Sequence, residues 1–181
     1  MKLAAFAAML AATALAQTEP ASDLSLRSEK VQGIEVRYAD WHWWPDLFAA
    51  MEKGGGATPE AKRNWMLFRL VNQSALTFEG KLVPASNYGL ALWPNLDGKG
   101  MMFELRRVDM REVYIKGLNV FGPLPEGTTI WKGPAKFETV SDTAERCSVS
   151  LAEDSGKVNV TIRYGNRRAV LTFARLAAPA S

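Results

Sequence analysis

The sequence has few of the side chains on which metal binding and nucleophilic catalysis usually depend. Its 181 residues include one cysteine and one histidine. A single thiol cannot form an internal disulfide, so the fold must be held together by its hydrophobic core. One His and one Cys also cannot supply the three or four ligands that zinc usually takes. We therefore expect no metal site and no cofactor.

Long hydrophobic runs are also scarce, apart from one stretch at the start. Lys2 precedes the uncharged residues 3–15, and the stretch ends in Ala14-Leu15-Ala16. A basic start, a short apolar run and small residues before the cut are the parts of a secretory signal peptide. The run is shorter than the roughly 20 residues that span a bilayer. The sequence thus predicts a signal peptide over 1–16, no transmembrane segment, and an exported protein that is periplasmic or extracellular.

Neither sign of charge dominates. Lysine and arginine number 22, aspartate and glutamate 19, and the net charge is +3. Nucleic-acid binders usually show a clustered basic face. Here Arg106-Arg107 and Arg167-Arg168 are pairs only, and neighbours in a strand point to opposite faces. We expect no nucleic-acid partner.

The chain is rich in short β-forming segments. Residues 34–38 and 157–164 alternate apolar and polar side chains, which is typical of half-buried strands. Further strands are expected at 65–71, 76–79 with a turn at Gly80, 88–93, 101–106, 113–116, 128–132, 136–140, 146–151 and 169–173. Hairpin turns are expected at Glu153–Gly156 and at Gly165-Asn166. One or two short helical turns are expected near 46–63, where Thr58-Pro59 offers a helix start.

These elements predict an all-β domain. About nine or ten short strands with tight turns favour a two-layer antiparallel β-sandwich, and a closed antiparallel β-barrel is the alternative. The domain is expected to cover residues 31–176. Residues 17–30 are polar and lack periodicity, so we expect a flexible leader there, and residues 177–181 are expected to form a frayed tail.

The segment 72–94 resembles a family of exported bacterial proteins known as domain of unknown function 2911. The residues that keep the spacing of the family's central hairpin are Pro84, Ala85, Tyr88, Leu90 and Pro94. The resemblance implies an exported bacterial β-sandwich. It implies no activity, because the family has no assigned one.

No set of residues indicates catalysis. A catalytic triad could use only His42, and no Gly-x-Ser-x-Gly segment exists to present a serine. The segment that begins at Asn95 is similar to a calcium loop, but Lys99 and Arg106 stand where oxygen ligands are needed. Cys147 shares one face of a predicted strand with Val149 and Leu151, so we expect a buried, unreactive thiol. We therefore name no catalytic residue.

The six tryptophans are the most unusual feature. Flat aromatic faces can stack on a ligand, and the candidate ligand-binding residues are Trp41, Trp43, Trp44, Trp93 and Trp131. Large aromatic side chains also dominate cores because of their area, so the segment 41–44 is alternatively expected to pack against one end or face of the sandwich. Trp93 would point outward beside Gly89 and Ala91, over a bare strip of the sheet.

The function that we expect is a non-catalytic binding or structural module of the cell envelope. Its partner would be a polysaccharide or another envelope protein. A carbohydrate-binding module that uses exposed tryptophans is one alternative, and a hydrolase of unrecognised type is another. Exposed tryptophan faces would favour sugar binding, and clustered acids in a cleft would favour the hydrolase.

Overall fold

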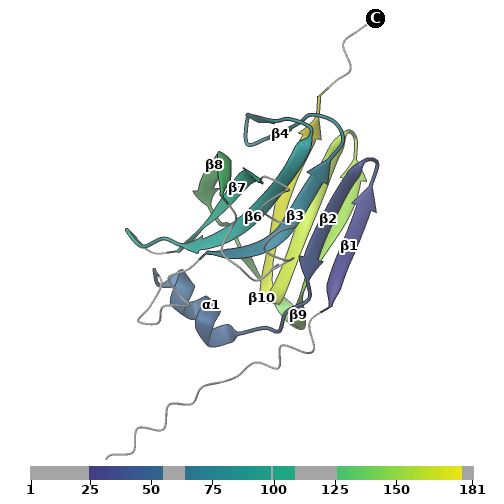
Figure 1. Ribbon diagram of the computed structural model, residues 1–181. Coiled ribbons are helices and arrows are strands. Elements are labelled where there is room, and N and C mark those ends of the chain that lie inside the picture. Colours follow the sequence, from purple (N-terminus) through teal and green to yellow (C-terminus); the bar gives the residue numbers. More distant parts are fainter. Residues whose placement is uncertain (1–24, 55–63, 99, 109–125, 177–181) are drawn as a thin grey trace, which may run out of the picture.

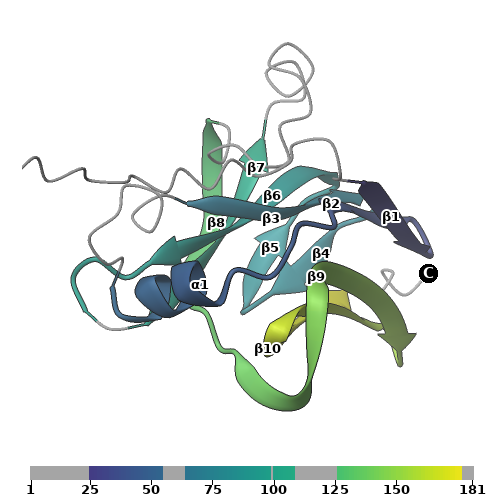
Figure 2. The same ribbon diagram turned by 90° about the horizontal axis from the view of Figure 1, so that it is seen from below.

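The structure is a computed structural model, and it describes residues 25–54, 64–98, 100–108 and 126–176. Two antiparallel sheets face each other in these residues, with one short helix at an end of the pair (Figure 1). The view from below separates the two layers (Figure 2). The prediction of an all-β, two-layer sandwich is confirmed, and the sheets do not close into a barrel.

The first sheet has six strands, in the order β1-β2-β3-β6-β7-β8. The strands are β1 (Leu26–Val31), β2 (Ile34–Ala39), β3 (Trp65–Asn72), β6 (Ser86–Pro94), β7 (Met101–Val108) and β8 (Gly127–Pro134). Neighbouring strands all pair antiparallel. Period-two alternation therefore sends one set of side chains toward the second sheet.

The second sheet has the order β5-β4-β10-β9. Its strands are β5 (Lys81–Val83), β4 (Leu76–Phe78), β10 (Lys157–Arg175) and β9 (Glu138–Asp154). The expected strands 136–140 and 146–151 are thus largely one long strand, β9. It continues because it pairs with β10 along most of its length, with irregular register near Gly165.

β10 folds back on itself. The N–H of Arg175 donates to the C=O of Gly156 over 2.8 Å, although the two residues stand at opposite ends of β10. A straight strand of this length would span about 60 Å, so the chain must reverse between them. Gly165 has φ +59°, as a two-residue hairpin turn that begins with glycine requires. The predicted turn at Gly165-Asn166 is confirmed.

The reversal gives β10 two arms. The first arm, 157–164, pairs with β9, and the second arm, 167–175, pairs with β4 at Phe173–Arg175. Buried residues are even-numbered in the first arm, as at Ile162, and odd-numbered in the second, as at Leu171. The change of parity follows from the turn, because both arms direct their apolar side chains into the same core.

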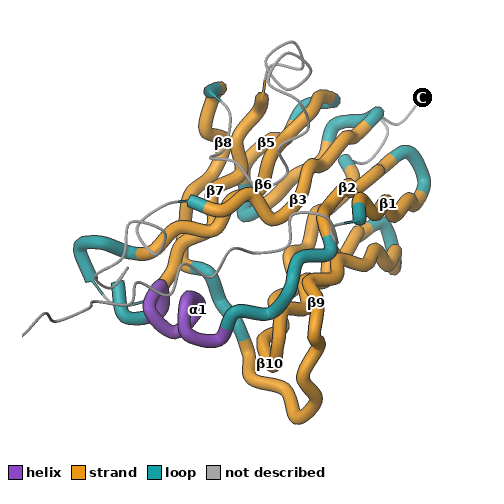
Figure 3. The backbone as a smooth tube through the Cα atoms, turned by 60° about the horizontal axis from the view of Figure 1, so that its bottom comes forward, coloured by secondary structure: helices purple, strands orange, loops and turns teal. Residues whose placement is uncertain are grey.

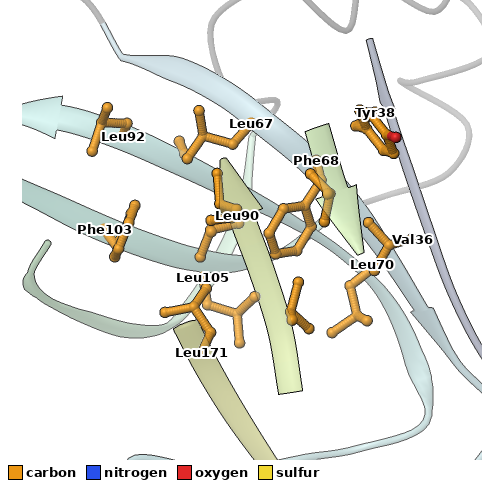
Figure 4. Packing of buried hydrophobic residues seen from close by; sticks show 14 of the residues in the cluster. Val36, Tyr38, Leu67, Phe68, Leu70, Leu90, Leu92, Phe103, Leu105 and Leu171 are labelled. Carbon is orange, nitrogen blue, oxygen red and sulfur yellow. The ribbon is translucent and has the colours of Figure 1, made fainter. Parts of the chain in front are cut away.

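The core lies between the sheets. Figure 4 shows Leu90 and Leu105 of the first sheet close to Leu171 of the second. These side chains are at most 7% exposed, and they belong to one continuous cluster. Burying a leucine side chain contributes about 1.5–3 kcal/mol, so this cluster stabilises the fold without a disulfide.

The chain crosses between the sheets after β2. Trp43 N–H donates to Glu145 C=O, and Cys147 N–H donates to Trp41 C=O, each over 2.8 Å. Residues 41–43 thereby pair with β9 of the second sheet, and Figure 3 shows this segment running from β2 to the helix. One side of the sandwich is fastened by backbone hydrogen bonds as a result.

The helix α1 (Pro45–Glu52) follows at once, and Pro45 occupies its first turn, where a missing N–H costs nothing. This helix confirms the prediction of a short helical turn near 46–63. The expected helix start at Thr58 lies outside the described residues. The expected strand 113–116 and tail 177–181 lie outside them too. Within the described residues, no helix is long and apolar enough to cross a membrane.

The prediction of a flexible leader over 17–30 is wrong for residues 26–30. These residues form most of β1, which pairs with β2 from Leu26↔Ala39 to Val31↔Ile34. All of β1 except Val31 is exposed, so it lacks the alternation that marks a half-buried strand. Residues 17–24 of the proposed leader, and the signal peptide 1–16, lie outside the described residues.

Candidate functional site

A groove opens between the two sheets on the side of β8. Its volume is about 170 Å³. The described residues that line it are Phe78, Glu79, Phe103, Trp131, Pro134, Lys136, Val170 and Leu171. These residues come from both sheets and from the link between β8 and β9, so the fold must be complete for the groove to exist.

The groove exists because β4 is short. Phe78 ends β4 and pairs with Lys81 across a two-residue turn. Glu79 (φ +48°) and Gly80 (φ +71°) form this turn, and positive φ at both positions is typical of type I′ hairpins. The chain therefore leaves the edge of β10 after Phe78, and β4 covers only Phe173–Arg175.

The start of β9 bounds the other end of the same edge. Glu138 pairs with Arg168, and Thr139 pairs with Arg167. Residues 169–172 lie between these contacts and β4, and no described strand pairs with them on this edge. We call these four residues the edge gap.

The backbone N–H and C=O groups of Val170 point into the edge gap. Successive residues in a strand direct their N–H and C=O groups to opposite edges. Arg175 bonds to the first arm of β10 through Gly156, so odd-numbered residues of the second arm face that arm. Val170 is even-numbered, and its N–H and C=O therefore point toward the groove. Its side chain is 48% exposed and lines the opening.

Trp131 forms an aromatic wall of the groove. Its ring meets Phe78 of the opposite sheet edge to face, with centroids 4.9 Å apart. The ring also lies against Gly133, where an added Cβ would collide with the indole. Trp131 is half-buried and therefore presents part of its ring to the opening.

Glu79 and Lys136 give the groove two opposite charges. Both residues are exposed and both line it, and they come from the β4–β5 turn and from the β8–β9 link. Phe103 and Leu171 supply an apolar floor, since both are almost completely buried. The groove can therefore hold a small ligand that has an apolar face and polar edges.

The other candidate tryptophans are not gathered at this groove. Trp41 is 5% exposed and lies in the core, where its ring centroid is 4.4 Å from that of Tyr164. Trp43 packs edge to face on Tyr164, at 4.5 Å, and lies against Gly165. Trp44 is half-buried and meets Trp65 at 6.4 Å. The expectation that segment 41–44 packs against the sandwich is confirmed.

Among the described residues, the space at this aromatic end of the sandwich is too small for a ligand. The space between α1 and the rings measures about 10 Å³. The residues around it are Trp41, Leu47, Phe48, Met51, Trp65, Leu92 and Tyr164. A single water needs at least this volume together with polar partners, so the space is a packing defect.

Trp93 lies on the outer face of the first sheet, away from the groove. It is half-buried, and Lys132 Nζ lies 4.7 Å from its ring centroid. The prediction of a bare strip beside it is wrong, because Gly89 and Ala91 are buried. Gly89 pairs with Arg69 on one side, and such long side chains cover a glycine on a sheet.

His42 and Cys147 have structural contacts. Nη2 of Arg146 lies 3.0 Å from His42 Nε2, and Arg146 also donates to the C=O of Asp40. Burial raises the pKa of the Cys147 thiol to about 12, as expected for a buried cysteine. Among the described residues, no three His, Cys, Asp or Glu side chains are placed to hold a metal ion.

The described residues define a β-sandwich with a small groove whose lining is partly apolar and partly polar. No model of a protein family, no curated protein and no solved structure matches this chain.

Of the groove residues, the sequence had indicated Trp131 alone. Glu79 was the last residue of an expected strand, but its charge gave no hint of a site. Lys136 and Val170 were assigned to ordinary strands. What brings them together is the difference in length between β4 and the second arm of β10, which no local pattern shows.

Proposed function

We propose that the protein is a non-catalytic binding module of the cell envelope and that the groove beside β8 is its ligand site. The observation that carries this proposal is the groove itself. It joins an aromatic wall at Trp131, opposite charges at Glu79 and Lys136, and a backbone donor and acceptor at Val170. Sites for small molecules commonly combine an apolar lining with a few placed polar groups.

A binding role is favoured over catalysis by the state of the two most reactive side chains. A thiol with a pKa of about 12 is neutral at pH 7 and is a poor nucleophile. His42 lies in a contact with Arg146, far from the groove residues in the fold. Neither residue lines the groove.

The proposal also includes export of the protein and its relationship to a family of exported bacterial proteins. The features of residues 1–16 support secretion into the periplasm or the medium. The resemblance of segment 72–94 to domain of unknown function 2911 supports an origin among exported bacterial proteins. A protein in this location would meet polysaccharides and other envelope proteins, and we propose one of these as its partner.

Co-sedimentation with isolated bacterial cell envelopes tests the proposal. We expect the purified mature protein to sediment with the envelopes, and Trp131→Ala to reduce the bound fraction at least tenfold. The matched control is Trp93→Ala, which removes an equally large ring from the outer face of the first sheet.

Two results would overturn the binding role of the groove. One is a wild-type protein that stays in the supernatant at every concentration. The other is equal retention of the Trp131→Ala and wild-type proteins, provided that circular dichroism shows both to be folded. Loss in the Trp93→Ala control instead would move the site to the outer face.

A further inference from the structure

The edge gap and the groove point to the class of ligand. We infer that the groove binds one pyranose ring that carries an acetamido group, as in N-acetylated amino sugars. This inference rests on the proposed function, since it names the ligand of the same site. Three properties of the groove carry it: its size, its backbone groups and its apolar floor.

The size of the groove fits part of one sugar unit, with the remaining substituents in solvent. A cavity of about 150 Å³ in another protein accommodates one benzene molecule, and this groove measures about 170 Å³. It is open to solvent at Val170 and Lys136, which are both exposed. Neighbouring units of a chain of sugars could therefore extend outward without entering the sandwich.

The short edge gap favours a compact ligand over an added peptide strand. β-Strand addition needs a run of unpaired backbone along an edge. Here β4 ends the gap at Phe173, and the start of β9 ends it at Arg168. The even-numbered residues Val170 and Thr172 direct their backbone groups toward this edge, and of the two only Val170 is among the residues that line the groove. So few donors and acceptors suit a small polar group better than an extended chain.

An acetamido sugar supplies the matching groups. Its carbonyl oxygen can accept from the N–H of Val170, and a neighbouring hydroxyl can donate to the C=O of Val170. The C–H face of the ring can lie on Trp131, as sugars commonly do on aromatic side chains. Glu79 and Lys136 can bond to the remaining hydroxyls, because their charged groups accept and donate.

The apolar floor explains why the acetyl group is needed. Phe103 and Leu171 are 1% and 7% exposed, and they offer no partner to a buried hydroxyl, which would lose its hydrogen bonds to water. A methyl group can be buried there at no such cost. A free amine in its place would bring a positive charge onto this apolar floor, where it would lose its hydration, so the deacetylated sugar should bind less tightly.

Calorimetric titration of the mature protein with three trisaccharides tests the inference. The probes are tri-N-acetylchitotriose, its deacetylated form chitotriose, and cellotriose, which bears hydroxyls at the same positions. We expect binding of the acetylated probe at least tenfold tighter than of the other two. Trp131→Ala should weaken that binding at least tenfold, and Trp93→Ala should leave it unchanged.

The backbone contact has its own variant. Val170→Pro removes the N–H that points into the gap, and proline is tolerated at edge positions whose N–H is not used by the sheet. We expect a melting temperature close to that of the wild type and at least tenfold weaker binding of tri-N-acetylchitotriose. If this variant does not fold, the comparison of the acetylated with the deacetylated probe in the wild-type protein still tests whether the groove prefers an acetamido group.

The possible failures separate this inference from the proposed function. Equal affinity for cellotriose would overturn the role of the acetyl group. Absence of binding to all three probes, with Trp131-dependent retention on envelopes, would overturn the sugar ligand and leave the binding module. Absence of retention on envelopes as well would overturn both.

Discussion

Tyr164 fixes the aromatic end of the sandwich with a few contacts. Its hydroxyl donates to the C=O of His42 over 2.8 Å and accepts from the N–H of Trp44 over 3.1 Å. The rings of Trp41 and Trp43 pack against it. These contacts tie the segment after β2 to the first arm of β10, so the segment has a structural role.

Replacing Trp41 should therefore be costly. Trp41→Ala is expected to lower the free energy of unfolding by about 3–5 kcal/mol, as usual for a buried tryptophan. His42→Ala should cost less, about 1.5–3 kcal/mol, which is the usual range for a hydrogen bond to a charged group such as the Arg146 guanidinium. Urea unfolding of both variants measures the difference. Similar losses for the two would contradict the packing role.

Cys147 should be inert in the folded protein. It is 1% exposed, and burial raises the pKa of its thiol to about 12. A thiol-specific reagent at pH 8 should label it only as fast as the protein unfolds, and should label it at once in denaturant. Fast labelling without denaturant would show that the side chain of Cys147 does not face the core. The register of β9 would then differ from the one described here.

At the scale of elements, the β1–β2 hairpin depends on one carboxylate. Glu35 accepts from Arg37 Nε over 2.5 Å and from Ser28 Oγ over 2.9 Å, and Lys30 lies 3.7 Å away. The hydrogen bond from Arg37 is the main reason why the pKa of Glu35 falls from its ordinary 4.5 to about 2. The folded state thus favours the charged form.

The lowered pKa of Glu35 determines how the stability of the protein depends on pH. A carboxylate whose pKa is lowered by folding stabilises the protein at pH values above its unfolded pKa, and this contribution is lost as protons bind. We expect the melting temperature to fall as the pH drops from about 4.5 toward 2. In Glu35→Gln this fall should be smaller than in the wild type. Parallel acid profiles of the two proteins would refute the role of Glu35.

The elements that the sequence predicted well are those with one buried and one exposed face. β2 and the first arm of β10 alternate clearly, and the turn at Gly165 carries glycine where φ is positive. β1 was missed because nothing in it alternates. The edge gap was missed because it depends on how far β4 and β9 extend along β10, which is a property of the whole sheet.

At the scale of the whole molecule, the sandwich is fastened on one side and open on the other. Residues 41–43 pair with β9 on the fastened side, while the groove lies between β8 and β10 on the other. The tryptophans follow this asymmetry. Those of segment 41–44 pack the end near α1, and Trp131 faces the opening.

Export is the whole-molecule property most easily checked. If residues 1–16 are a signal peptide, the secreted protein should begin at Gln17, after cleavage behind Ala16. Intact mass and N-terminal peptides of the protein recovered from the periplasm or medium measure this. A protein that keeps Met1 after recovery from the same fraction would contradict it.

The proposed ligand site depends on unpaired backbone groups at Val170, and amide hydrogen exchange measures directly whether they are unpaired. The N–H of Leu171 points to the first arm of β10 and should exchange slowly, whereas the N–H of Val170 should exchange fast in the free protein. Saturating tri-N-acetylchitotriose should slow exchange at Val170 and leave Leu171 unchanged. Protection of Val170 equal to that of Leu171 in the free protein would contradict the account, because the edge would then be covered.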